Sequence, residues 1–190
     1  AVRALAFVPD GSVLVSAADD MLLRLWRITG DETPVIQESQ ILKEHRHTVH
    51  RVLVSPDGHW LASADGAGIA YLWNLQKLEQ HFMLNANAGA LRDLAFSHDS
   101  TTLGAVTQEA GVVLWSVQTH EIQYTLHTGQ IALRSLAFSP DHSLLVCGAQ
   151  NGMAYFWNLE TRQRVREMRL HTHCIWRLAF SPDGQMLVST

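Results

Sequence analysis

A short segment recurs five times along the chain at nearly constant spacing. It joins apolar residues to a turn of the Ser-Pro-Asp-Gly type, and its copies are Ala6–Gly11, Leu53–Gly58, Ala95–Ser100, Ala137–His142 and Ala179–Gly184. The first step is 47 residues, and the next three are 42. A tryptophan keeps the same spacing at Trp26, Trp73, Trp115 and Trp157. Because two independent markers stay in phase, the chain must repeat one structural unit.

Each repeat is predicted to form four short strands. The first strand runs into the turn, where Pro fixes φ, Asp bonds its own backbone and Gly adopts positive φ, so a tight hairpin follows. The second strands are expected at Val13–Ala17, Leu61–Ala64, Thr102–Val106 and Leu144–Gly148. The third strands carry the tryptophans, at Leu23–Trp26, Ala70–Trp73, Val112–Trp115 and Ala154–Trp157. The fourth strand, for example Gln80–Leu84, is polar and suits an outer edge.

The repeats divide one partial domain, residues 1–190, into copies at about 1–42, 43–84, 85–126 and 127–168 and a partial copy at 169–190. A lone four-stranded sheet cannot bury both faces, so repeated sheets must stack, and radial stacking makes a propeller. The predicted fold class is all-β: a β-propeller segment of four four-stranded antiparallel blades plus the first two strands of a fifth. The five extra residues of the first step are expected in a longer loop around Thr29–Pro34.

The sequence resembles the WD40 repeat family over essentially all of its 190 residues. The family's Gly-His pair, valine strand, Ser-Pro-Asp-Gly turn and Trp-Asp correspond in the second repeat to Glu44-His45, Val49, Ser55–Gly58 and Trp73-Asn74. The resemblance implies a hydrogen-bonded tetrad of His, Ser or Thr, Asp and Trp in each blade. It gives a structural role to His45, His171, Trp26, Trp73, Trp115 and Trp157.

Most of the implied tetrads are expected to be broken. The histidine position holds Asn87 and Gly129 in the third and fourth repeats. The hydroxyl position is assigned to Ala18, Asp65, Thr107 and Ala149. The acid position is assigned to Asp20, Ala67, Glu109 and Asn151. On this assignment only the third repeat keeps a hydroxyl and an acid together.

The residue after the opening Val or Leu of each first strand is expected near one mouth of a central channel lined by these strands. These residues are Arg3, His50, Arg92, Arg134 and Trp176. Cations beside an aromatic ring can hold an acidic peptide or a phosphate. The loops expected on the same face carry Arg46, His47 and His173. We predict that all of these residues bind a partner; the alternative is that Arg is simply common at this exposed position.

The resemblance implies a protein-interaction scaffold or sensor module, as in WD40 modules of bacterial multidomain proteins. Its partner is expected to be a protein, a peptide or another domain of the same polypeptide. Family propellers usually have seven blades, so the chain is expected to be part of a longer polypeptide or to complete itself by self-association. A net charge of −4 gives no general attraction to nucleic acid or anionic membrane.

Reading nucleic acid or anionic lipid through surface arginines is the alternative function. Arg162, Arg164 and Arg166 alternate along a predicted outer strand, which would place them on one side. Such a basic stripe suits phosphates. A charged outer strand also protects a sheet edge from pairing with another chain, and this interpretation is favoured.

No catalytic motif is present: the chain lacks a GxSxG elbow, a Gly-rich phosphate loop and an HExxH helix, so it is not predicted to be an enzyme. No cofactor or metal is expected, because the spacing of His171, His173 and Cys174 matches no known zinc pattern. Only two cysteines occur, and no apolar stretch approaches the roughly 20 residues of a membrane span. These features predict a cytoplasmic protein without membrane contact.

Overall fold

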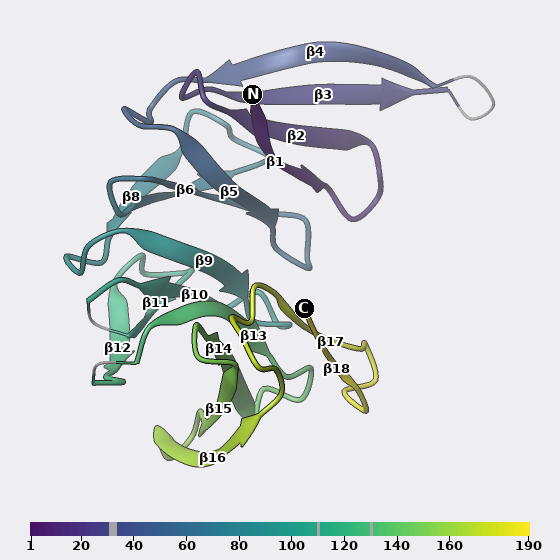
Figure 1. The fold of residues 1–190 in the computed structure, drawn as a ribbon. Helices are drawn as coiled ribbons and strands as arrows, with labels where there is room; N and C mark the ends of the chain where they lie inside the picture. The colour runs from purple at the N-terminus through teal and green to yellow at the C-terminus, as the bar shows by residue number, and fades with distance from the viewer. Residues whose placement is uncertain (31–33, 110, 130) are drawn as a thin grey trace. The chain divides into compact units, whose positions relative to one another are not determined.

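The computed structural model describes residues 1–30, 34–109, 111–129 and 131–190 (Figure 1). Within these ranges the chain forms eighteen β-strands and no helix. The strands make four antiparallel four-stranded sheets and one two-stranded sheet. The all-β fold and the number of sheets predicted from the repeats are confirmed.

The strands follow the chain in order within each sheet. The first sheet is β1 (Val2–Phe7), β2 (Val13–Ala18), β3 (Leu23–Thr29) and β4 (Val35–Leu42). The second is β5 (Val49–Val54), β6 (Trp60–Asp65), β7 (Ile69–Asn74) and β8 (His81–Asn85). The third is β9 (Leu91–Phe96), β10 (Thr102–Thr107), β11 (Val112–Ser116) and β12 (Ile122–Leu126). The fourth is β13 (Leu133–Phe138), β14 (Leu144–Ala149), β15 (Met153–Asn158) and β16 (Gln163–Arg169), and the two-stranded fifth is β17 (Leu178–Phe180) and β18 (Leu187–Ser189).

The extra residues of the first repeat lengthen the strands of the β3–β4 hairpin. Strands β3 and β4 have 7 and 8 residues, whereas β7 and β8 of the second sheet have 6 and 5. Residues 31–33 of the predicted turn Thr29–Pro34 lie outside the described ranges. The β3–β4 hairpin is therefore longer than its counterpart in the second sheet (Figure 1).

The described strands form two compact units, residues 1–85 and 86–190, called here the N-terminal and C-terminal units. In the N-terminal unit, β1 and β2 contact β5, and one apolar cluster includes Val15, Leu25 and Val52 from the two sheets. In the C-terminal unit, β9 and β10 contact β13, and β13 and β14 contact β17. Neighbouring sheets within a unit thus approach through their first and second strands, which buries apolar faces that a lone sheet leaves in water.

Four of the turns after the first strands share one hydrogen-bond pattern. The Ser55 hydroxyl donates to the Asp57 carboxylate at 2.5 Å and accepts the Trp60 N–H at 2.9 Å. The same two contacts recur at Ser97, Ser139 and Ser181. Because the side chains supply bonds that the main chain of a turn lacks, this short motif is enough to fix each hairpin.

Strand β16 carries an extra residue opposite β15 and does not alternate regularly. Phe156 pairs with Arg166 and Trp157 pairs with Arg164, with a register shift between the two pairs. Directly opposite residues share a face of the sheet, and Phe156 and Trp157 are neighbours on opposite faces. The prediction that the outer arginines share one side is therefore wrong. Consistently, Arg164 lies over the ring of Tyr155 and Arg166 over the ring of Phe156.

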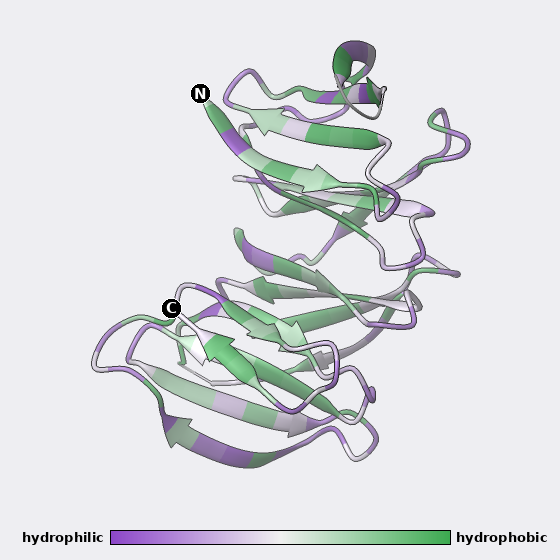
Figure 2. Cartoon of the chain, turned by 90° about the vertical axis from the view of Figure 1, so that its right-hand side faces the viewer, coloured by the Kyte–Doolittle hydropathy of each residue, from purple (hydrophilic) through white to green (hydrophobic). Residues whose placement is uncertain are grey.

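The arginines of this outer edge are held by aromatic rings. Besides those two contacts, Arg162 Cζ lies 4.4 Å from the ring centre of Tyr124 on β12. Figure 2 shows β16, lowest in that view, as largely hydrophilic, while the strands packed inside the sheets are largely apolar. This arrangement agrees with a charged strand that protects a sheet edge.

Candidate functional site

The second sheet contains a complete buried tetrad. His45 Nδ1 lies 2.9 Å from Asp65 Oδ2, and His45 Nε2 lies 2.7 Å from Ser63 Oγ. The Trp73 indole N–H donates to the same hydroxyl at 2.9 Å, and all four residues are buried. Since a carboxylate only accepts, Nδ1 carries the proton and Nε2 accepts from Ser63. The sequence analysis assigned the hydroxyl to position 65 and the acid to Ala67, and both assignments are wrong by two residues: the hydroxyl is Ser63 and the acid is Asp65.

The Asp65 carboxylate is stabilised in its charged form. Burial raises its pKa, but the hydrogen bonds from His45 and from the Ile69 and Ala67 N–H groups outweigh burial. The pKa of Asp65 therefore lies below its usual value. The tetrad is a structural hydrogen-bond network and leaves neither ring nitrogen of His45 for a ligand.

The other sheets keep only parts of the tetrad. Trp26 donates to Ser16 at 2.8 Å in the first sheet, and His171 Nε2 lies 2.8 Å from Ser189 Oγ in the fifth. In both hydroxyl–tryptophan pairs the serine stands ten residues before the tryptophan. This constant spacing could have located the hydroxyl from the sequence. Thr107, expected to be the surviving hydroxyl of the third repeat, donates to the Gly111 carbonyl.

The hydroxyl position holds Ala105 in the third sheet and Cys147 in the fourth. Cys147 is fully buried, and burial, assisted by the charge of Asp93, raises the pKa of its thiol well above the usual range. A thiol that stays protonated is a poor nucleophile. Cys147 is therefore a packing residue.

A β-bulge lies near the start of each first strand. The register shifts leave one residue without a directly opposite partner in each four-stranded sheet: Arg3, His50, Arg92 and Arg134. Just before β17 of the fifth sheet, the N–H groups of Trp176 and Arg177 both donate to the Thr190 carbonyl, at 2.6 and 3.4 Å, so that two residues face one, as in a bulge. A bulge moves a side chain out of the regular alternation. The five residues predicted to bind a partner at the starts of the first strands are thus the bulge residues. The sequence pattern aligned these residues but did not predict that a bulge occurs there.

The bulge of the first sheet carries an ion pair. Arg3 Nε donates to Asp19 Oδ1 at 2.5 Å, and its Nη2 donates to Oδ2 at 3.0 Å. These bonds lower the pKa of Asp19 to about 2. At the second bulge His50 is half-buried, and Gly66 occupies the turn position that holds Asp19 in the first sheet.

The bulges of the C-terminal unit carry cations bonded to neutral groups. Arg92 Nη2 donates to Gln108 Oε1 at 2.9 Å, and Arg134 Nη2 donates to Gln150 Oε1 at 3.4 Å. The two glutamines stand at the turn position that holds an aspartate in the first sheet. Trp176 is 60% exposed, and Arg134 Cζ lies 5.7 Å from the centre of its ring.

The three predicted loop residues, Arg46, His47 and His173, lie in different surroundings. Arg46 and His47 line a pocket of about 370 Å³ whose lining does not include His50. The other lining residues are Glu44, Asp65, Ala67, Ile69, Tyr71 and Met83. His173, in the C-terminal unit, is exposed, and its Nδ1 lies 2.9 Å from Thr172 Oγ1.

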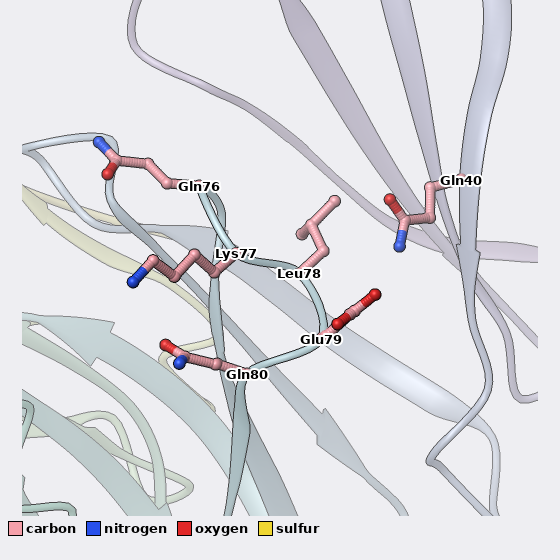
Figure 3. A pocket seen from close by; sticks show the side chains of 6 residues that line it. All are labelled: Gln40, Gln76, Lys77, Leu78, Glu79 and Gln80. Carbon is pink, nitrogen blue, oxygen red and sulfur yellow. The ribbon is translucent and has the colours of Figure 1, made fainter.

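Another depression, of about 440 Å³, lies in the N-terminal unit between β4 and the loop joining β7 to β8. Figure 3 shows Gln40 on one side and the loop residues on the other: Gln76, Lys77, Leu78, Glu79 and Gln80. The side chains are amides, one leucine and one pair of opposite charges. This lining creates no net charge and no reactive group, and it contains none of the predicted binding residues.

No three His, Cys, Asp or Glu side chains converge as a metal site requires, within the ranges that the structure describes. The same ranges contain no helix able to cross a bilayer.

The family model described as "WD domain, G-beta repeat" matches residues 1–27, 36–74, 118–158 and 162–190. The unmatched stretch between residues 74 and 118 includes most of the third sheet. There Asn87 and Ala105 replace the tetrad histidine and hydroxyl. The third sheet nevertheless has the same four strands as its neighbours.

Known proteins resemble parts of the chain. Human WD repeat and SOCS box-containing protein 1 is 38% identical over 77 residues, which are 40% of this chain and 17% of that protein. Protein hir1 of Aspergillus terreus is 32% identical over 110 residues, 55% of this chain and 10% of that protein. Small ribosomal subunit protein RACK1 of Neurospora crassa is 30% identical over 105 residues, 55% of this chain and 31% of that protein. The chain thus spans less than a third of each relative's length.

Proposed function

The chain belongs to the WD domain, G-beta repeat family, and from this membership we propose that it is a protein-interaction scaffold or sensor module of a larger protein. The proposed binding residues are, within each unit, the bulge residues of the first strands together with residues of the loops that precede them. They are Arg3, Arg46, His47, His50, Arg92, Arg134, His173 and Trp176.

Membership in the family supports this function in general terms. WD40 repeat proteins generally mediate protein–protein interactions, and the family is typically non-catalytic. The names of two relatives connect such repeats with a SOCS box and with the small ribosomal subunit, so these repeats occur beside other modules and within assemblies. The proposed partner is a protein, a peptide or another domain of the same polypeptide. A cytoplasmic location is part of the proposal, and imaging of the tagged full-length protein tests it.

The aligned bulges are the observation that carries the choice of surface. Each bulge moves one side chain per sheet out of the packed faces. The side chains at these positions differ, being Arg, His or Trp, while the strands around them repeat. Variable side chains on a fixed backbone are what a rigid scaffold presents to a partner.

Charge reversal at two bulges tests the surface. In the tagged full-length protein, Arg92→Glu with Arg134→Glu should reduce partner recovery from an extract of its own cells by about tenfold or more, because like charges at an interface cost several kcal/mol. Quantitative mass spectrometry measures recovery. Arg164→Glu on β16 makes the same charge change on an outer strand and should leave recovery unchanged.

Recovery of the same partners at wild-type levels by the folded double variant would remove this surface from the proposal. Loss of the partners in the β16 variant, with retention in the double variant, would move the site to the outer edge. The alternative of nucleic acid or anionic lipid as ligand has less support, because Arg164 and Arg166 lie on opposite faces and over aromatic rings.

A further inference from the structure

The bulge arginines of the two units differ in charge compensation. Arg3 is bonded to a carboxylate, whereas Arg92 and Arg134 are bonded to the side-chain carbonyl oxygens of Gln108 and Gln150. Within the described residues, neither Arg92 nor Arg134 forms an ion pair. A neutral amide oxygen orients a guanidinium but does not cancel its charge. The C-terminal unit therefore presents two oriented, uncompensated cations.

The acidic groups nearest in sequence are directed elsewhere. Asp93, adjacent to Arg92, is buried, accepts the Leu136 N–H at 3.3 Å and lies 3.7 Å from Arg177 Nη1. Its charge thus compensates Arg177. Glu109 packs against the loop that precedes β9. The positive charge of Arg92 and Arg134 remains available to a ligand.

Trp176 adds an apolar platform beside these cations. Its ring is mostly exposed, and the Arg134 guanidinium lies over it. Contact with an aromatic face orients a guanidinium while its edge N–H groups remain able to donate. The five N–H donors of an arginine match the paired oxygens of a carboxylate or phosphate.

We infer that the surface formed by Arg92, Arg134 and Trp176 binds an acidic segment of a partner protein. This inference rests on the proposed protein-binding function and names the chemistry of the partner. Asp or Glu carboxylates of the segment bind the two arginines, and a neighbouring apolar side chain packs on Trp176. The shared chemistry is an oxyanion on a peptide, which a phosphorylated serine also supplies. The whole chain has a net charge of −4, so only this local charge attracts such a segment.

Two dye-labelled synthetic peptides test the inference on the 190-residue chain by fluorescence anisotropy. One has Glu at every second position around a central Leu, and the other has Gln in place of each Glu. The Glu peptide should bind about tenfold more tightly than the Gln peptide. This preference should largely disappear between about 50 and 500 mM salt, since exposed charges are screened.

Matched variants assign the effect to residues. Arg92→Gln with Arg134→Gln should abolish the preference for Glu, whereas Arg164→Gln on β16 should retain it. Trp176→Ala should weaken the binding of the Glu peptide and of the Gln peptide to the same extent. A phosphoserine peptide that binds more tightly than the Glu peptide, and depends on the same arginines, supports the oxyanion site and identifies phosphate as its source. Circular dichroism and thermal melting establish that each variant folds.

Equal binding of the Glu and Gln peptides overturns the inference. So does wild-type binding of the Glu peptide to the double Gln variant. Duplex DNA or anionic vesicles that bind through Arg92 and Arg134 more tightly than the Glu peptide also overturn it, in favour of a non-protein anion. The proposed function fails by a different result, namely unchanged partner recovery by the charge-reversed full-length protein.

Discussion

Ser63 shows what a single side chain contributes in this fold. Its hydroxyl connects His45 and Trp73, yet the third sheet forms with Ala105 at the same position. The hydroxyl therefore stabilises a sheet whose strands are specified by other residues. The sequence identified the histidine and the tryptophan but misplaced the hydroxyl by two residues. A shift of two keeps a side chain on the same face of a strand, so the apolar alternation could not reveal the error.

Ser63→Ala should destabilise the protein more than Ser16→Ala. The first change leaves two buried nitrogens, on His45 and Trp73, without the hydroxyl, and each unsatisfied buried group costs about 1–3 kcal/mol. The second change removes one bond, to the half-buried Trp26, and should cost about 1 kcal/mol. Urea unfolding monitored by tryptophan fluorescence measures both. Equal losses in the two variants would contradict a cooperative role for the tetrad.

Turns and bulges differ in how far the sequence determines them. A Ser-x-Asp turn is built from contacts between residues two to five positions apart, such as Ser139 with Asp141 and Leu144, so its motif predicts the hairpin. A bulge depends on how two strands pair, as β9 does with β10 and β16 with β15, so the sequence of one strand alone does not specify it. The repeat alignment therefore identified the bulge residues as equivalent positions. It wrongly placed the outer arginines of β16 on one face of the sheet.

The turn aspartates should make stability depend on acid. The Ser139 hydroxyl, followed by the Ser143 N–H and hydroxyl, lowers the pKa of Asp141 to about 2. The Ser181 hydroxyl and the Gln185 N–H lower the pKa of Asp183, and the hydroxyl and N–H of Ser12 lower the pKa of Asp10. A carboxylate with a lowered folded-state pKa contributes stability above its unfolded pKa, about 4. That contribution is lost as the pH falls through the folded value. The urea midpoint should therefore fall between about pH 4 and pH 2.

Asp141→Asn should lower the midpoint at neutral pH and make it less sensitive to pH in this window, because the substituted side chain does not titrate. Glu167→Gln, on the exposed edge strand β16, serves as the control for the loss of one surface acid. A wild-type pH profile in Asp141→Asn would show that the turns do not control acid unfolding.

At the scale of the whole molecule, the first sheet exposes an apolar face that its counterparts bury. Leu5 and Phe7 on β1 are each 59% exposed. The equivalent side chains on β13, Leu136 and Phe138, are 3% and 8% exposed and pack against the third sheet. The sequence predicted the repeated sheets because each repeat contains its own pattern. Exposed apolar faces of this kind promote association, and the residues of β1 alone do not specify what covers them.

Leu5→Ser with Phe7→Ser should reduce self-association of the 190-residue chain. Burying side chains of this size contributes about 1.5–3 kcal/mol each, so the association constant should fall by about tenfold or more. Light scattering after size-exclusion chromatography at several concentrations measures it. Val165→Ser removes a single exposed apolar side chain from β16 and should change little. An unchanged association constant in the double variant would mean that β1 takes no part in it.

The bulges also bear on how such a chain can be modified. Each bulge residue belongs to a sheet whose strands pair with one another, so exchanging one leaves the strand pairing of the other sheets in place, although Arg134 and Trp176 contact each other. A display library randomised at positions 3, 50, 92, 134 and 176 should therefore yield mostly folded members with altered preferences. Selection from that library would turn the proposed recognition residues into a source of new binders.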